Sequence, residues 1–256
     1  MVEPKVWHYR ELLKNLIVKD LKLKYRGSFL GFLWSLLNPL AMITVYSIAF
    51  KYILRIQLEN FTLFLFTGIL PWTFFSATAM ASTEAVISNA NLVKKIYFPR
   101  EILPLATVLF NLVQFLMALA VFFPVLIFLQ GKLSWALLAY PVVMLLHLAF
   151  TVGVALLLSA ITVFYQDVKH LTEVGLMTLF WITPVLYHLS MVPQQGQILF
   201  KLNPLTVYIT AYQDIVYWGR WPAMETWALG VLWAGAMLVL GWWVFRRYKP
   251  FFVEEL

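Results

Sequence analysis

Long apolar stretches alternate with short polar segments along the chain. Six stretches contain no Asp, Glu, Lys or Arg: residues 27–50, 60–83, 102–131, 133–166, 174–200 and 226–245. A helix needs roughly 20 apolar residues to cross a bilayer core of about 30 Å, so each stretch is long enough for one crossing. We expect the fifth crossing to end near Ser190, because Pro193 and Gly196 follow. The pattern predicts an all-α integral membrane protein with six transmembrane helices.

The basic residues indicate which side of the membrane the termini face. Of the 19 Lys and Arg residues, 14 fall in segments that six crossings would place on the same side as both termini. Cytoplasmic segments are enriched in Lys and Arg, so both termini are predicted to be cytoplasmic. The net charge of +7 follows from this asymmetry and from attraction to membrane lipids with anionic headgroups. It gives no reason to expect a nucleic-acid partner.

The segment before the first apolar stretch has a helical pattern of its own. Its apolar residues recur at helical spacing and its lysines lie largely off that face: Tyr9, Leu12, Leu13, Leu16, Ile17 and Leu21 against Lys14, Lys19 and Lys22. This pattern is typical of a helix in the cytoplasmic membrane interface. A helix packed on protein would show the same pattern.

We interpret residues 1–256 as one transmembrane domain. Its predicted parts are an interface helix, the first two spans, a cytoplasmic connection, spans three to five, an external segment, and the sixth span with the tail: 1–26, 27–90, 91–100, 101–190, 191–225 and 226–256.

The chain offers little chemistry for catalysis. It has no cysteine, its four histidines are scattered, and it contains no GxxxxGK[ST] phosphate-binding loop. His147 lies inside the fourth apolar stretch. A neutral histidine packed among its neighbours is the more common case, and a functional group within the membrane is the alternative. We therefore expect no catalytic residue, metal or cofactor in this chain. If ATP drives the protein, another subunit must bind it.

Several aromatic residues lie too deep in the apolar stretches to belong to an interfacial belt, and others lie close to these deep residues in the sequence. They can pack helices together, or they can line a channel whose flat ring faces let a sugar chain slide past. The candidate channel residues are Trp34, Tyr46, Trp72, Trp181 and Tyr187.

The external segment contains a helix too short to cross the membrane. Asn203 is a predicted N-cap and Pro204 suits the first helical position. The apolar residues that follow share one face, so the helix either caps the bundle or gates its exit. The candidate gate residues are Asn203, Pro204, Tyr208, Tyr212 and Trp218.

The segment NLVKKIYFPREILP, residues 91–104, combines basic and aromatic residues between the second and third spans. Sidedness explains its lysines and Arg100 but not an exposed Ile96-Tyr97-Phe98. We expect a helix of one or two turns, a corner before Pro99, and a third span that opens at Pro99. An apolar corner with basic flanks on the cytoplasmic side is typical of a docking surface.

Four motifs resemble the membrane subunit of ABC-2 type exporters for polysaccharides. They are KYRGSFLGFLWSLLNPL at 24–40, NLVKKIYFPREILP at 91–104, FYQDVKHL at 164–171 and NPLTVYITAYQDIVYWG at 203–219. The O-antigen (lipopolysaccharide) permeases are the most similar, and the teichoic acid and capsule permeases are near relatives. The chain departs from the family at Gln166, where a basic residue is usual, so an ion pair from that position is not expected.

The resemblance implies a homodimer in the bacterial inner membrane, with a channel between the subunits and two copies of an ABC ATPase that bind ATP-Mg. It implies a lipid-linked glycan as cargo. It also implies that the ATPase receives a coupling helix formed by Leu92, Val93, Lys94, Lys95, Ile96, Tyr97, Phe98, Pro99 and Arg100.

Arg26 follows the interface helix and is a candidate contact for the lipid diphosphate of that cargo. An interfacial arginine that extends to the lipid headgroups is the simpler reading. Two other classes of function compete with the exporter: a channel or carrier without an ATPase, and a membrane enzyme such as a lipid-linked sugar transferase. Buried carboxylates would favour a carrier, and clustered His, Asp or Ser residues would favour an enzyme.

Overall fold

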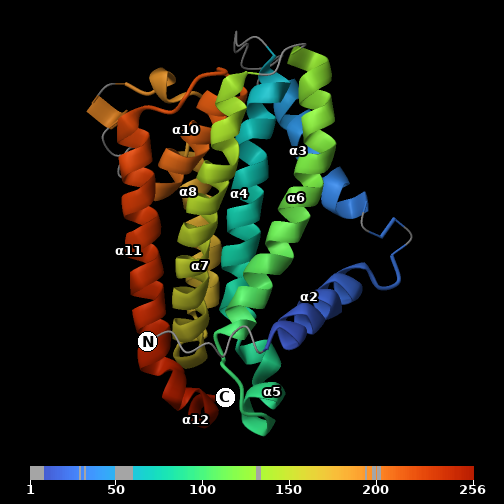
Figure 1. Ribbon diagram of the computed structural model, residues 1–256, viewed down its shortest axis with the longest axis vertical. Coiled ribbons are helices and arrows are strands. Elements are labelled where there is room, and N and C mark those ends of the chain that lie inside the picture. The colour runs from blue at the N-terminus through green and yellow to red at the C-terminus, as the bar shows by residue number, and fades with distance from the viewer. Residues whose placement is uncertain are drawn as a thin grey trace.

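The computed structural model describes residues 9–28, 30–31, 33–49, 60–130, 134–193, 195–197, 200 and 203–256. Its frame is a bundle of four long helices, α4 (Phe61–Glu84), α6 (Ile102–Gln130), α7 (Tyr140–Phe164) and α11 (Met224–Tyr248), which run roughly along the long axis of the molecule (Figure 1). These four are long and apolar enough to cross a membrane. They match the second, third, fourth and sixth apolar stretches. The chain is therefore a multi-pass membrane protein.

Two shorter helices correspond to the first and fifth stretches. α3 (Leu33–Ile48) has 16 residues and α8 (Val168–Ile182) has 15. The expected boundaries of the fifth stretch were wrong at both ends. α8 starts before residue 174 because the polar residues that follow Asp167 continue the helix, and it ends well before Ser190 because Thr183 precedes Pro184 and is extended. Crossing by α3 and α8 stays a prediction.

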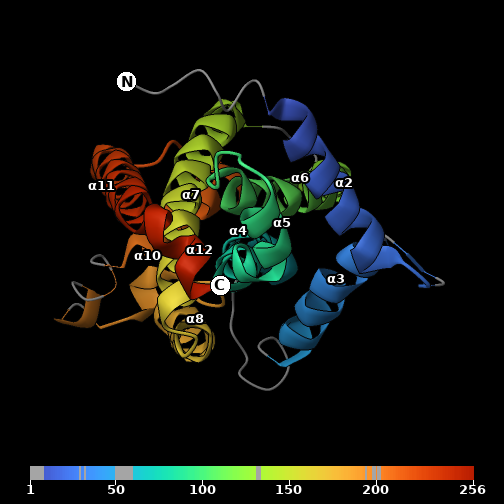
Figure 2. The ribbon, with the colours of Figure 1, turned by 90° about the horizontal axis from the view of Figure 1, so that it is seen from below.

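α4 lies at the centre of the bundle, with α3, α6, α7, α8 and α10 (Pro204–Val216) packed around it (Figure 2). Most of its residues are buried, because apolar side chains project from every side of the helix and each side meets a neighbour. Short 3₁₀ helices join the bundle at the ends: η3 (Trp135–Ala139) precedes α7 and η4 (Leu189–Met191) follows α8.

α2 (Arg10–Tyr25) packs obliquely against α6 rather than standing in the bundle (Figure 1). Leu16 is buried and Leu12, Leu13, Ile17 and Leu21 are half-buried, which agrees with the amphipathic pattern of the sequence. The helix ends where Arg26 adopts an extended conformation and Gly27 takes a φ of 73°, a value that favours glycine.

α7 and α11 approach each other closely. A Cβ built on Gly241 would lie 2.0 Å from the carbonyl oxygen of Gly153, and a Cβ on Gly153 would lie 2.3 Å from that of Met237. Small residues allow such backbone contact between membrane helices.

Candidate coupling surface and channel residues

The connection between α4 and α6 forms a protruding corner. η2 (Ile87–Asn89) leads into α5 (Ala90–Lys95), after which the chain is extended at Ile96. Tyr97 is 93% exposed and Ile96 is 56% exposed, while Val93 is buried. Lys94 and Lys95 lie exposed beside them. The structure thus presents an aromatic and an aliphatic side chain with two cations at one end of the bundle.

Two details of this corner differ from the sequence expectation. Phe98 is only 4% exposed, because it belongs to a buried apolar cluster that includes Val93, Ile102 and Phe252. α6 begins at Ile102 rather than at Pro99, since a turn comes first in which Ile102 N–H donates to the Pro99 carbonyl at 3.1 Å. The exposed part of the corner is therefore smaller than we expected.

The C-terminal residues bond to this corner and pack against it. Lys249 Nζ donates to both carboxylate oxygens of Glu101, at 2.7 and 2.9 Å, and Arg100 Nη1 donates to the Lys249 carbonyl. Beyond η5 (Lys249–Phe251), Phe252 in α12 (Phe252–Glu255) is fully buried, and α12 contacts α5 (Figure 2). The corner is thereby fastened to the end of α11 as well as to α4 and α6.

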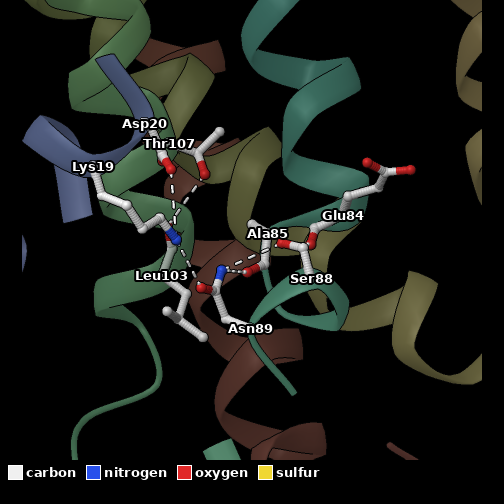
Figure 3. Close-up of polar contacts among 8 residues, drawn as sticks. All are labelled: Lys19, Asp20, Glu84, Ala85, Ser88, Asn89, Leu103 and Thr107. Carbon is white, nitrogen blue, oxygen red and sulfur yellow. Dashed lines mark hydrogen bonds and ion pairs between the residues drawn. The ribbon is translucent and has the colours of Figure 1, made fainter. Parts of the chain in front are cut away.

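A chain of polar contacts joins α2 to the residues just ahead of α5 (Figure 3). Lys19 Nζ donates to Asn89 Oδ1 at 3.2 Å and lies 3.6 Å from an Asp20 carboxylate oxygen. Asn89 Nδ2 donates to the Ala85 carbonyl at 2.9 Å, and Ser88 Oγ donates to the Glu84 carbonyl at 2.7 Å. α2 is therefore bonded to the same connection that carries the exposed corner.

Beside this connection lies an open groove of about 540 Å³ between the ends of α4 and α7 and the start of α8, lined by residues that include Ser88, Gln166, Asp167 and His170. Lys169 of α8 forms an ion pair with Glu84 of α4 across it. Gln166 is exposed in the groove. The ion pair in this region thus comes from Lys169.

The candidate channel aromatics gather only in part. The ring centroid of Phe180 lies 5.4 Å from that of Trp72, 6.2 Å from that of Tyr46 and 5.6 Å from that of Trp181. Phe180 links these side chains of α3, α4 and α8. The sequence analysis did not single it out, although its place next to Trp181 was a usable signal.

The members of this group differ in exposure. Trp72 is 7% exposed and packs helices together within the chain, whereas Trp181 is 60% exposed. Tyr187 Oη donates to the Trp181 carbonyl at 2.7 Å, and burial raises the pKa of Tyr187 to about 12. Trp34, 48% exposed, lies apart near the start of α3. Among the described candidates, only the exposed rings are placed to line a channel.

The short helix predicted to begin after Asn203 forms as expected, as α10. Asn203 Oδ1 accepts from Leu205 N–H at 3.0 Å, which confirms the predicted cap, and Pro204 occupies the first turn. Tyr208 and Tyr212 are each 1% exposed, and Tyr208 Oη donates to the Gly230 carbonyl of α11 at 2.8 Å. These two tyrosines are core residues of this chain.

Trp218 follows the end of α10 at a more open site. It is 42% exposed and meets the ring of His188 at 5.3 Å and the guanidinium of Arg220 at 5.8 Å. Burial and then the charge of Arg220 lower the pKa of His188. An exposed aromatic ring therefore lies beside an imidazole and a cation at this site.

His147 belongs to the core. It is 1% exposed and lies among the rings of Phe74, Phe75, Tyr208 and Tyr212, with centroids 5.1 to 6.2 Å away. Within the described part of the chain, neither ring nitrogen has a hydrogen-bond partner. This placement favours the packed, neutral reading, although without the hydrogen bond that such a residue usually makes. Arg26, the candidate diphosphate contact, is exposed at the end of α2.

Comparison with known proteins decides the family. The family model described as "ABC-2 type transporter" matches residues 11–217, which cover α2 through the end of α10. The chain belongs to the ABC-2 type transporter family. The residues matched by this ABC-2 family include the α4–α6 corner and the capped helix α10, which carry two of the four motifs.

Three curated relatives refine the position within the ABC-2 family. The chain is 35% identical to the O-antigen export system permease protein RfbA of Myxococcus xanthus, over 98% of this chain and 97% of that protein. It is 34% identical to RfbA of Klebsiella pneumoniae, over 96% and 95% respectively. The polysialic acid transport protein KpsM of Escherichia coli is more distant, at 24% over 80% of each chain. The relatives are named as permease or transport proteins rather than as enzymes.

Proposed function

We propose that this chain is the membrane subunit of an ATP-driven exporter that moves a lipid-linked polysaccharide of O-antigen type out of the cytoplasm. Near full-length similarity to two O-antigen export permeases carries this proposal. The more distant polysialic acid transport protein makes capsule export the second candidate, and teichoic acid export remains an expectation from the motifs.

The mechanism follows from what the chain offers. It lacks a phosphate-binding loop, so ATP-Mg is bound by a partner ATPase, two copies of which serve a homodimer in the bacterial inner membrane. We propose six crossings, with α3 and α8 added to the four long helices and both termini cytoplasmic. The channel then runs between two copies, where exposed rings such as Trp34 and Trp181 offer weak, repeated contacts to a sugar chain.

The α4–α6 corner is the part that the ATPase would move. Tyr97 is almost fully exposed at the tip, and its ring would fill an apolar pocket of a partner, while Lys94 and Lys95 would meet acidic rim residues. Glu101 and Lys249 fasten the corner to the end of α11. A displacement of the corner would therefore reach α6 and α11 together.

The test is reconstitution of the full chain in vesicles with the ABC ATPase encoded beside it. We expect ATP hydrolysis that depends on the permease and export of a lipid-linked glycan. Tyr97→Ala should lower both at least tenfold without loss of inserted protein, while Trp135→Ala, also highly exposed but outside the corner, serves as the matched control. ATP hydrolysis that is the same with and without this chain would refute the exporter. Transport unchanged in Tyr97→Ala would refute the coupling role of the corner.

A further inference from the structure

α2 starts near the end of the bundle that carries the corner (Figure 1). Further along α2, Lys19 lies beside Leu103 and Thr107 of α6 (Figure 3). At the other end of α2, Lys24 Nζ donates to Gln114 Oε1 and lies 5.6 Å from the ring centroid of Phe110. The oblique course of α2 thus carries a cation well along α6.

The depth of this cation follows from helix geometry. Gln114 is twelve residues beyond the start of α6 at Ile102, or about 18 Å along the helix at 1.5 Å per residue. α2 is predicted to lie in the membrane interface, so the Lys24 side chain extends from the interface toward the apolar stretch of α6. An ionisable group at the edge of the apolar core is costly, and such groups usually mark a substrate or ion site.

The surroundings of Lys24 are polar and form a small cavity. A cavity of about 120 Å³ lies between α2, α3, α4 and α6 and is lined by Lys24, Asn38, Thr73, Asn111 and Gln114 together with apolar side chains. Among the described residues that line it, none is a carboxylate. The carboxamide oxygen of Gln114 solvates the ammonium but does not neutralise it. The cavity therefore has room and unbalanced positive charge for one small anionic group.

We propose that this cavity binds the phosphate group of a lipid, namely the diphosphate of the carrier lipid that anchors the glycan. Its identity as the carrier lipid rests on the proposed function. A lysine ammonium is a compact charge that binds phosphate, and the amide groups of Asn38 and Gln114 are hydrogen-bond donors of the kind that hold its oxygens. Asn38 is exposed on α3, so the lipid tail and the glycan can stay outside the cavity. The volume suits a phosphate group and is too small for an oligosaccharide.

The test uses the full-length chain in phosphatidylcholine nanodiscs, titrated calorimetrically with farnesyl diphosphate. We expect wild type to bind, Lys24→Met to bind at least tenfold more weakly, and Lys24→Arg to recover part of the loss by keeping the charge. Lys22→Met is the matched control, because Lys22 is an exposed lysine on the same helix, and it should stay within twofold of wild type. Melting temperatures within a few degrees of wild type establish that the variants are folded.

Equal binding by wild type and Lys24→Met would overturn the proposal, as would equal binding of farnesol, which has no phosphate. Displacement by inorganic diphosphate at equal concentration would overturn a lipid as the source, and displacement by phosphatidylglycerol would overturn the carrier lipid in favour of a bulk lipid. Because no ATPase is present, the result is separable from the exporter. Binding that depends on Lys24, combined with ATP hydrolysis unaffected by this chain, would remove the exporter and keep the phosphate site.

Discussion

The close contact between α7 and α11 gives the sharpest prediction about stability. Replacing Gly241 by Ala would put a Cβ 2.0 Å from the Gly153 carbonyl oxygen, a distance that real Cβ atoms essentially never show. The atom it meets belongs to the backbone, so no side chain can rotate away and the two helices must separate by about 1 Å or more. Overpacking of this kind costs about 1–3 kcal/mol, and sometimes more.

Gly235→Ala is the matched control on the same helix, because a Cβ there meets nothing within 4 Å. Alanine is a better helix former than glycine by about 1 kcal/mol, so this variant should be as stable as wild type or slightly more stable. Thermal unfolding followed by intrinsic fluorescence measures the difference, since the chain has 11 tryptophans.

At roughly 2–4 °C per kcal/mol for a domain of this size, Gly241→Ala should melt several degrees below Gly235→Ala. A Gly241→Ala protein that melts at or above the temperature of Gly235→Ala would show that α7 and α11 are not packed backbone to backbone. The proposed path from the corner through α11 into the bundle would then lose its tightest link.

Three further predictions concern the two ends of the bundle. Phe98→Ala should lower the free energy of unfolding by about 3–5 kcal/mol, because its ring is buried. Tyr97→Ala should change the free energy of unfolding by less than about 0.5 kcal/mol, because its ring is exposed. Equal losses of stability in melting experiments would contradict the division into packing and docking residues. Lys249→Glu and Glu101→Lys should each destabilise the protein by about 1.5–3 kcal/mol and reduce the glycan exported per ATP. The double exchange should restore most of the stability and most of the transport. No recovery would refute the ion pair as the connection between the corner and the end of α11. Burial lowers the pKa of His188, so its contribution to stability is complete above about pH 6.5 and is lost as the pH falls toward the lower pKa of the folded state. His188→Gln should therefore reduce the dependence of the melting temperature on pH between pH 5 and 8. An unchanged dependence would exclude His188 as its cause.

Local rules predicted the features that adjacent residues decide. The cap at Asn203 needs only its own side chain and the backbone of Leu205, so the sequence was sufficient. The burial of Phe98 was not predictable in that way, because the apolar cluster that covers it includes Phe252, some 150 residues further along the chain. The gathering of three aromatic rings around Phe180 is likewise a matter of how helices pack.

Helix limits show the same division. The four long helices follow from the length of their apolar stretches, which composition alone reveals. The start of α8 was missed because Lys169 lies in a segment that reads as a polar loop. In the structure it pairs with Glu84 of α4, and this contact between distant segments accommodates charge in the first turn. The topology inferred from charge counts stays a prediction, whereas the pairing of the charges could not be predicted from the sequence at all.

The bonds around α10 have a mechanical consequence for the exit. Asn203 Nδ2 donates to Thr183 Oγ1 at 2.8 Å and Gln213 Nε2 donates to the Pro184 carbonyl at 2.7 Å, both just past the end of α8, while Tyr208 Oη is bonded to α11. Swinging α10 alone would break three buried hydrogen bonds, each with a cost of about 1–3 kcal/mol when a partner is left unsatisfied. We therefore expect α8, α10 and α11 to move as one rigid block. If two copies form the proposed channel, its exit would then widen by rigid-body movement of this block in each copy, without a change in the structure of the block.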